Sequence, residues 1–160
     1  MNFYKFLKNE EADFKERYLK DIWKYNHEEI EKYHDFIQLI FSTNKQSMSV
    51  FHKYHLNDIK QIEQIKNDKD IRENILYSTN WFINFLENKN HWKSGYNHNQ
   101  LRITRIIECL KLLVSDEEAH TFYKKVTSLI DDKNKINKIT YKYWEDALIR
   151  ASNDASLSNK

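Results

Sequence analysis

Apolar residues recur about every 3.6 positions along almost the whole chain, and this spacing favours amphipathic helices. The sequence contains no proline and a single glycine, Gly95. An all-β domain needs many tight turns, which depend on glycine, proline, asparagine and aspartate. Asparagine could serve some of those turns, but the helical periodicity decides the class. The sequence therefore predicts an all-α protein.

The size and composition indicate one domain with a substantial core. The chain has 160 residues, of which 40% are hydrophobic and 14% aromatic, and a chain of this length can bury a core without disulfide bonds. We expect residues 1–151 to form the domain and residues 152–160 to form a flexible polar tail. The formal net charge of +2 gives no strong signal for nucleic-acid binding.

Cysteine usage and hydropathy bear on the compartment. Cys109 is the single cysteine, which excludes an internal disulfide bond and fits a reducing compartment. The sequence has no apolar run as long as a membrane span, and its N-terminus lacks the apolar stretch of a secretory signal. We therefore expect a soluble cytoplasmic protein without a transmembrane segment. The oligomeric state stays open.

Periodicity and capping residues together predict about seven helices. The second of them has the clearest start, because Asn26 and Glu29 have the spacing of a capping box. Each helix except the first and the last begins at a capping Asn, Asp or Ser. The expected ranges are 11–25, 26–41, 57–65, 68–86, 99–114, 115–130 and 141–148.

Two arginines within one apolar run form the most informative motif. Lysine outnumbers arginine 21 to 5, yet Arg102 and Arg105 lie three positions apart in the segment HNQLRITRII, residues 98–107. Arginine carries a planar, permanently charged fork that can bind a carboxylate through two hydrogen bonds. We infer that this segment contains arginine rather than lysine because the planar guanidinium group can make such paired hydrogen bonds.

Polar side chains flank the apolar faces of two expected helices. On a helical wheel they lie beside the core positions of helices 26–41 and 99–114. We call this group the polar seam; its members are Glu31, His34, Gln38, His98, Asn99, Arg102 and Arg105. If the two flanks meet, we expect Glu31 to accept a bidentate bond from Arg102 or Arg105, because a half-buried guanidinium needs an acceptor.

Two interpretations of the polar seam stay open at this point. The seam could be structural and fix the register of two helices, since structural ion-pair networks are common. It could instead line a pocket that binds an anionic or peptide ligand. Neither interpretation requires a cofactor, a metal ion or a catalytic residue, and we predict none.

Two further motifs are weaker. His52 and His55, with His91 in another loop, lack the cysteine pair or nearby carboxylate that would complete a tetrahedral zinc site. Cys109 lies on the flank of the arginines, and nearby cations favour a thiolate. It is three helical turns from His98, however, so we do not expect it to act as a nucleophile. We interpret the histidines of the loops as surface residues.

Two segments resemble the conserved domain of the opioid growth factor receptor family. Residues 23–25 (WKY), 30–31 (IE) and 34–41 (HDFIQLIF) resemble its first signature. Residues 98–106 resemble its second signature, His-Asn-x-Leu-Arg-Ile-Thr-Arg-Ile, in the same order along the chain. The similarity covers roughly residues 3–151. The chain departs from the family where Leu39 replaces a tryptophan and Ser42 replaces a proline.

The resemblance implies an all-helical domain like that of the opioid growth factor receptor family. The name of that family implies a role in receptor signalling. Animal members join this domain to a nuclear import segment and long repeats, so enkephalin binding is not carried over to this short chain. We expect a non-catalytic interaction or regulatory module that binds a peptide or a protein. The alternative is a small-anion or nucleotide-binding protein, or an enzyme, that uses His34, His98, Arg102 and Arg105 around a pocket.

Overall fold

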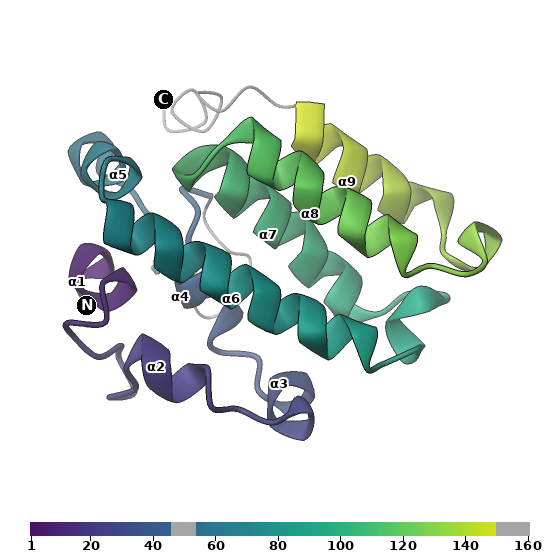
Figure 1. Cartoon of the computed structure of the whole chain (residues 1–160), viewed down its shortest axis with the longest axis horizontal. Coiled ribbons are helices and arrows are strands. Elements are labelled where there is room, and N and C mark those ends of the chain that lie inside the picture. The colour runs from purple at the N-terminus through teal and green to yellow at the C-terminus, as the bar shows by residue number, and fades with distance from the viewer. Residues whose placement is uncertain (46–53, 150–160) are drawn as a thin grey trace.

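The computed structural model describes residues 1–45 and 54–149, and this part of the chain is built from helices (Figure 1). The expected all-α class is confirmed. The α-helices in the described ranges are α1 (Phe3–Leu7), α2 (Leu19–Ile22), α3 (His27–Lys32), α4 (Ile37–Ile40), α5 (Ile59–Lys66), α6 (Lys69–Glu87), α7 (His98–Leu113), α8 (Asp116–Ser128) and α9 (Lys138–Ile149). Two short 3-10 helices, η1 (His91–Lys93) and η2 (Lys133–Lys135), lie in the connections before α7 and α9.

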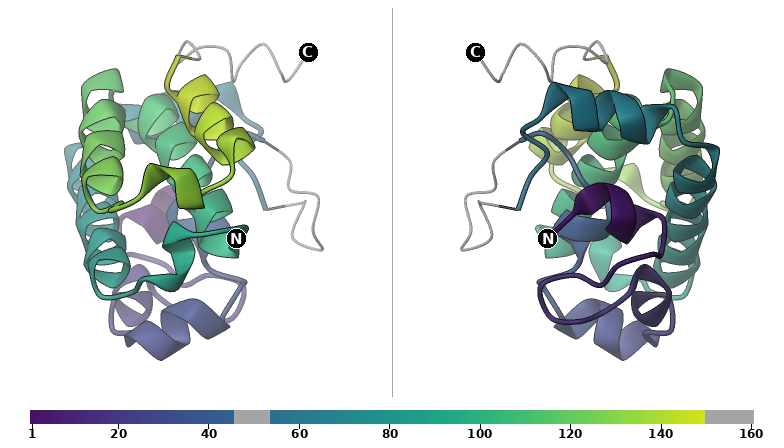
Figure 2. Two further views of the ribbon diagram at one scale, coloured as in Figure 1. Left: turned by 90° about the vertical axis from the view of Figure 1, so that its right-hand side faces the viewer. Right: turned by 90° about the vertical axis from the view of Figure 1, so that its left-hand side faces the viewer.

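The four long helices α6 to α9 form the body of the molecule, and α7 lies at its centre. α6 and α8 form the face towards the viewer in Figure 1, and the side views of Figure 2 show α7 and α9 behind them. α7 packs most extensively against α8 and α9. A single apolar core joins side chains from all the α-helices in the described ranges. Several other elements therefore lie within reach of α7, and this placement decides what its polar residues contact.

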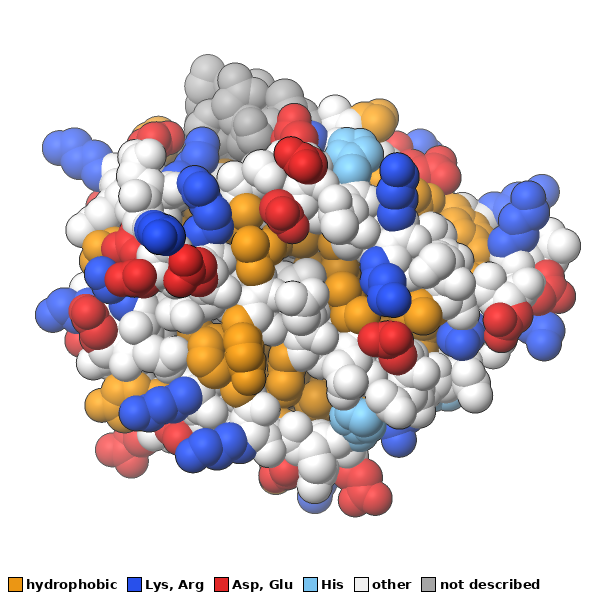
Figure 3. All heavy atoms as spheres, viewed as in Figure 1, with side chains coloured by type: hydrophobic (Ala, Val, Ile, Leu, Met, Phe, Trp, Pro, Cys, Tyr) orange, Lys and Arg blue, Asp and Glu red, His pale blue; other side chains and the backbone are white. Residues whose placement is uncertain are grey.

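The face formed by α6 and α8 carries charges of both signs. Lysine, arginine, aspartate and glutamate side chains alternate over this face, with apolar side chains visible between them (Figure 3). A surface that binds nucleic acid usually gathers cations in one patch or stripe. This face shows no such patch.

The expectation of one helix over residues 11–25 is wrong for most of its length. The carboxylate of Asp13 accepts hydrogen bonds from the main-chain N–H groups of Lys15 and Arg17, each at 2.9 Å. Glu16 has a left-handed φ of 61°, and the Arg17 side chain donates back to Asp13 at 2.8 Å. An aspartate that binds nearby N–H groups in this way offers the backbone an alternative to the helix. Only the short α2 remains.

The second expected helix, over residues 26–41, is divided into α3 and α4. Its start is as predicted, because Asn26 accepts from the N–H of Glu29 at 2.8 Å and Glu29 accepts from the N–H of Asn26 at 3.0 Å. α3 ends after one and a half turns, since Tyr33 has an extended backbone with a ψ of 135°. The last carbonyl groups of α3 therefore have no helical partners and need donors from elsewhere.

The later helices begin close to the expected positions. The expected caps of α6 and α8 are confirmed. Asp58 caps α5 instead of Asn57, and Asn97 caps α7 instead of Asn99. The second difference matters for the polar seam, because it places Asn99 inside α7, where its side chain is buried and available for tertiary contacts.

Several expectations fall outside the described residues. These are the tail over residues 152–160, the domain boundary at residue 151, most of the loop over residues 42–55, and His52 within that loop. Within residues 1–45 and 54–149, none of the helices has the length and apolar character needed to cross a membrane.

Candidate functional site: the polar seam and a tyrosine cleft

Arg102 crosses from α7 to the end of α3. Its Nη1 donates hydrogen bonds to the carbonyl oxygen of Ile30 at 2.8 Å and to Oδ1 of Asn99 at 3.1 Å. Its Nη2 donates to the carbonyl oxygen of Tyr33 at 2.7 Å. These carbonyls lie where α3 ends and the partial negative charge of a helix gathers. The guanidinium of Arg102 therefore caps the C-terminus of α3 from another helix.

Arg105 has the same role one turn further along α7. Its Nε donates to the carbonyl oxygen of Phe41 at 3.0 Å, and its Nη2 donates to the carbonyl oxygen of Gln38 at 3.1 Å. Both acceptors lie in the last turn of α4 and the residue that follows it. The two arginines thus hold two short helices, each too short to be stable alone, against the central helix.

The expectation that Glu31 binds one of the arginines is wrong. Glu31 instead accepts a hydrogen bond from Nδ2 of Asn99 at 3.0 Å, and its Oε1 lies 2.5 Å from Nε2 of His91. Nε2 of His98 lies 2.5 Å from Oε2 of Glu31, without the alignment of a hydrogen bond. Glu31 faces the first turn of α7, while the guanidinium groups bind main-chain carbonyls of α3, α4 and the residues that end them.

His34 and Gln38 complete the polar seam at its rim. The ring of His34 packs edge-to-face on the ring of His98, with centroids 4.8 Å apart. Gln38 donates to the carbonyl oxygen of His34 at 3.2 Å, and its Oε1 is buried without a hydrogen-bond partner among the described residues. The structure therefore brings the seven predicted residues together, but most of their strong bonds are made to the main chain.

Burial dominates the electrostatics of the polar seam. It lowers the pKa of Arg102 to about 10 and also lowers the pKa of Arg105, and Arg102 keeps its proton at neutral pH. Burial, with the nearby positive charge of Arg102, lowers the pKa of His98. Burial alone would raise the pKa of Glu31, but hydrogen bonds from Asn99 and His91 outweigh it and the net shift is downward.

We expect the free energy of unfolding to decrease as the pH falls below about 6.5, the ordinary pKa of histidine. The pKa of His98 is lower in the folded state, so between the two values the unfolded chain binds the proton first and acidification favours unfolding. Above this range the ring of His98 is neutral in both the folded and the unfolded state, so its contribution to the free energy of unfolding does not change with pH. Glu31 adds a second loss only below its ordinary value of 4.5.

Urea unfolding at pH values between about 8 and 5 checks this expectation. The variant His98→Asn should show a flatter dependence of the unfolding free energy on pH than the wild type. Two parallel profiles would show that His98 is not the group responsible.

The thiol of Cys109 is not suited to act as a nucleophile. Cys109 is fully buried, and burial raises the pKa of its thiol to about 12, so the thiol stays protonated at neutral pH. Within the described parts of the chain, His, Cys, Asp and Glu side chains form no group of three that could hold a metal ion.

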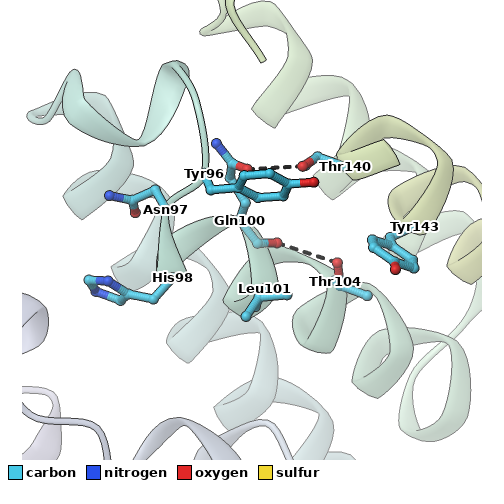
Figure 4. A pocket seen from close by; sticks show the side chains of 8 residues that line it. All are labelled: Tyr96, Asn97, His98, Gln100, Leu101, Thr104, Thr140 and Tyr143. Carbon is cyan, nitrogen blue, oxygen red and sulfur yellow. Dashed lines mark hydrogen bonds between the residues drawn. The ribbon is translucent and has the colours of Figure 1, made fainter. Parts of the chain in front are cut away.

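A cleft of about 410 Å³ opens beside the polar seam, between the start of α7 and the start of α9. Three large hydrophobic side chains on its rim are exposed: Tyr96 by 73%, Leu101 by 67% and Tyr143 by 52%. Figure 4 shows these three side chains around one hollow, with Tyr96 in the loop before α7 and Tyr143 on α9. We call it the tyrosine cleft; it is lined by Tyr96, Asn97, His98, Gln100, Leu101, Thr104, Thr140 and Tyr143.

The polar groups on the floor of the tyrosine cleft are engaged within the protein. Gln100 donates to the carbonyl oxygens of Trp92 at 2.9 Å and Gly95 at 3.0 Å. Its Oε1 accepts from the hydroxyl of Thr140 at 3.0 Å, and its carbonyl oxygen accepts from the hydroxyl of Thr104 at 3.3 Å (Figure 4). The cleft therefore offers mostly apolar surface to a ligand.

Sequence reasoning missed the tyrosine cleft, although one signal was present. On a helical wheel Leu101 lies about 160° from Ile103, on the side of α7 opposite the core face. A leucine on the polar side of an amphipathic helix, next to a loop with an exposed tyrosine, is such a signal. Tyr143 could not be found in this way, because it comes from another helix about forty residues later.

The comparisons with known proteins give one distant relative. The chain is similar to the opioid growth factor receptor of Mus musculus, with 29% identity over an alignment of 106 residues that covers 55% of this chain. The chain spans only 16% of the length of the mouse protein. No family model and no solved structure matches the chain. The expected relationship is therefore supported as a distant similarity.

Proposed function

We propose that this opioid growth factor receptor-like protein is a non-catalytic interaction module that binds a peptide segment of a partner protein in the tyrosine cleft. The observation that carries the proposal is the convergence of three exposed hydrophobic side chains, from one loop and two helices, on one hollow. Concave apolar surfaces with a few polar groups are the usual form of a binding site. Tyrosine is enriched at protein interfaces, since it has an apolar ring and a polar tip.

The polar seam supports this site and does not compete with it. Arg102 and Arg105 already donate to main-chain carbonyls, so their forks are not directed at a bound anion. The bonds hold α7 against α3 and α4, and the same helix presents Leu101 to the cleft. Binding of an anion or nucleotide would require these donors to be free, which makes a peptide or protein the better-supported ligand.

Selection from a displayed library of random peptides tests the proposal. We expect the wild-type protein to enrich a peptide family, and Leu101→Glu to weaken binding of its members about tenfold or more, as loss of a central apolar contact does. Because Leu101 is exposed, the variant should keep its stability within about 0.5 kcal/mol of the wild type.

Ile59→Glu is the matched control. Ile59 is an exposed aliphatic residue, 56% accessible, on α5 and outside the tyrosine cleft, so this variant should bind the selected peptides like the wild type. Absence of any enriched peptide, or equal loss of binding in both variants, would overturn the proposal.

A further inference from the structure

The side chains that line the tyrosine cleft carry little charge. Among the described residues that form it, none is Lys, Arg, Asp or Glu. The ring of His98 is turned away from the tyrosines in Figure 4, towards the side on which Glu31 lies. A charged side chain of a ligand would lose its hydration in this cleft without gaining a partner of opposite charge, and such a transfer is costly.

The floor of the tyrosine cleft also disfavours a polar side chain. Gln100, Thr104 and Thr140 use their hydrogen-bonding groups on one another and on the main chain. Because their donors are already used, a carbonyl oxygen of a ligand side chain placed against them would exchange its bonds to water for none to these residues. An apolar side chain incurs no such loss and buries its own surface against the rings and Leu101.

The rim of the tyrosine cleft keeps two polar groups available. The hydroxyls of Tyr96 and Tyr143 make no hydrogen bond within the described part of the chain, and both lie on exposed side chains. They are suited to bonds with the main-chain N–H or C=O groups of a peptide beside its buried side chain. The volume of about 410 Å³ is near the lower end of ligand pockets, so it suits one or two side chains and not a whole helix.

We infer that the tyrosine cleft binds one uncharged apolar side chain of leucine or phenylalanine type from a peptide, whose adjoining main chain is bound by the hydroxyls of Tyr96 and Tyr143. The inference rests on the proposed function and adds the chemical class of the ligand to it. A larger groove of about 610 Å³ between α6 and α8 does not have this character, because Glu87, Glu118 and Lys125 are among its lining residues.

Capped amino acids serve as probes of this ligand class. The amides of N-acetyl-leucine, N-acetyl-phenylalanine, N-acetyl-asparagine, N-acetyl-glutamate and N-acetyl-lysine are added at millimolar concentration to the 15N-labelled protein. We expect the leucine and phenylalanine probes to shift the amide signals of Tyr96, Leu101 and Thr140. The asparagine and charged probes should bind about tenfold more weakly or not at all.

Two variants separate the apolar contact from the hydroxyl contact. The double variant Tyr96→Phe with Tyr143→Phe keeps both rings, so it should bind the apolar probes several-fold more weakly through loss of the bonds to their amide groups. Leu101→Glu places a carboxylate in the cleft and should reverse the preference towards the lysine probe. Tyr77→Phe, at an exposed tyrosine of α6, is the control and should bind like the wild type.

The results overturn the ligand class if a charged probe binds the wild type as well as the leucine probe does, or if no probe shifts signals at the cleft. They also distinguish this inference from the proposed function. If the selected peptides carry a charged side chain at the binding position and bind Leu101→Glu more weakly, the proposed interaction module is retained and the inferred ligand class is wrong. If the apolar probes bind but no peptide is selected, the preference of the cleft for apolar groups is retained and the proposed interaction module is wrong.

Discussion

Replacing Arg102 with methionine should lower the free energy of unfolding by about 3 kcal/mol or more. Methionine can fill much of the same volume, so the loss comes mainly from polar groups and not from a cavity. The carbonyl oxygens of Ile30 and Tyr33 lose their donor and stay partly buried, and each such group costs about 1–3 kcal/mol. Urea unfolding followed by circular dichroism measures the effect.

Two further variants make the expected result specific to the fork of Arg102. Arg72→Met removes an exposed guanidinium on α6 and should change the unfolding free energy by no more than about 0.5 kcal/mol. Arg102→Lys keeps the charge but lacks the planar fork that reaches two carbonyls, so its loss should lie between the other two. A loss near zero for Arg102→Met would show that water satisfies the end of α3.

Replacing Gln100 with leucine should lower the free energy of unfolding by about 2–4 kcal/mol. This buried side chain joins three parts of the fold, because it donates to the carbonyls of Trp92 and Gly95 before α7 and accepts from Thr140 on α9. Leucine has a similar size but leaves all three partners unsatisfied. The loop that carries Tyr96 should also become more mobile, which hydrogen exchange at Gly95 can detect.

Gln38→Leu is the matched control for this substitution. The Gln38 side chain makes one hydrogen bond, at 3.2 Å, and its Oε1 is buried with no partner in the described ranges. Removing an unsatisfied buried oxygen offsets the loss of one bond, so we expect a change of less than about 1 kcal/mol. Equal losses for the two glutamine variants would mean that the network of Gln100 adds nothing beyond an ordinary polar contact.

The segment that carries the family resemblance is directed mostly inward. Asn99, Gln100, Arg102 and Arg105 bind other parts of the protein, and Leu101 is the residue between them that is exposed. A protein with a similar segment could therefore use the same arginine-to-carbonyl bonds to hold two short helices against a central one. Similarity at this segment therefore bears mainly on the fold, although His98, Gln100, Leu101 and Thr104 of the same segment also line the tyrosine cleft.

Sequence reasoning succeeded where the determinant is local. The period of the apolar residues gave the all-α class, and Asn26 with Glu29 gave the start of α3, because a capping box depends on side chains three positions apart. It failed at the break after Lys32. The apolar period continues through residues 33–36, but the backbone leaves the helix at Tyr33, and Arg102 of α7 binds the carbonyls of Ile30 and Tyr33 at this break.

The amino-acid sequence by itself determined the helical class and the capped starts of α3, α6 and α8, since these follow from periodicity and from contacts within one turn. The tertiary structure alone decided what the arginines bind, because every residue carries a carbonyl oxygen and no pattern marks the few that lack a partner. It also decided the tyrosine cleft, whose rim joins Tyr96 and Leu101 to Tyr143 on another helix. Such a surface exists only once α7 and α9 are packed together.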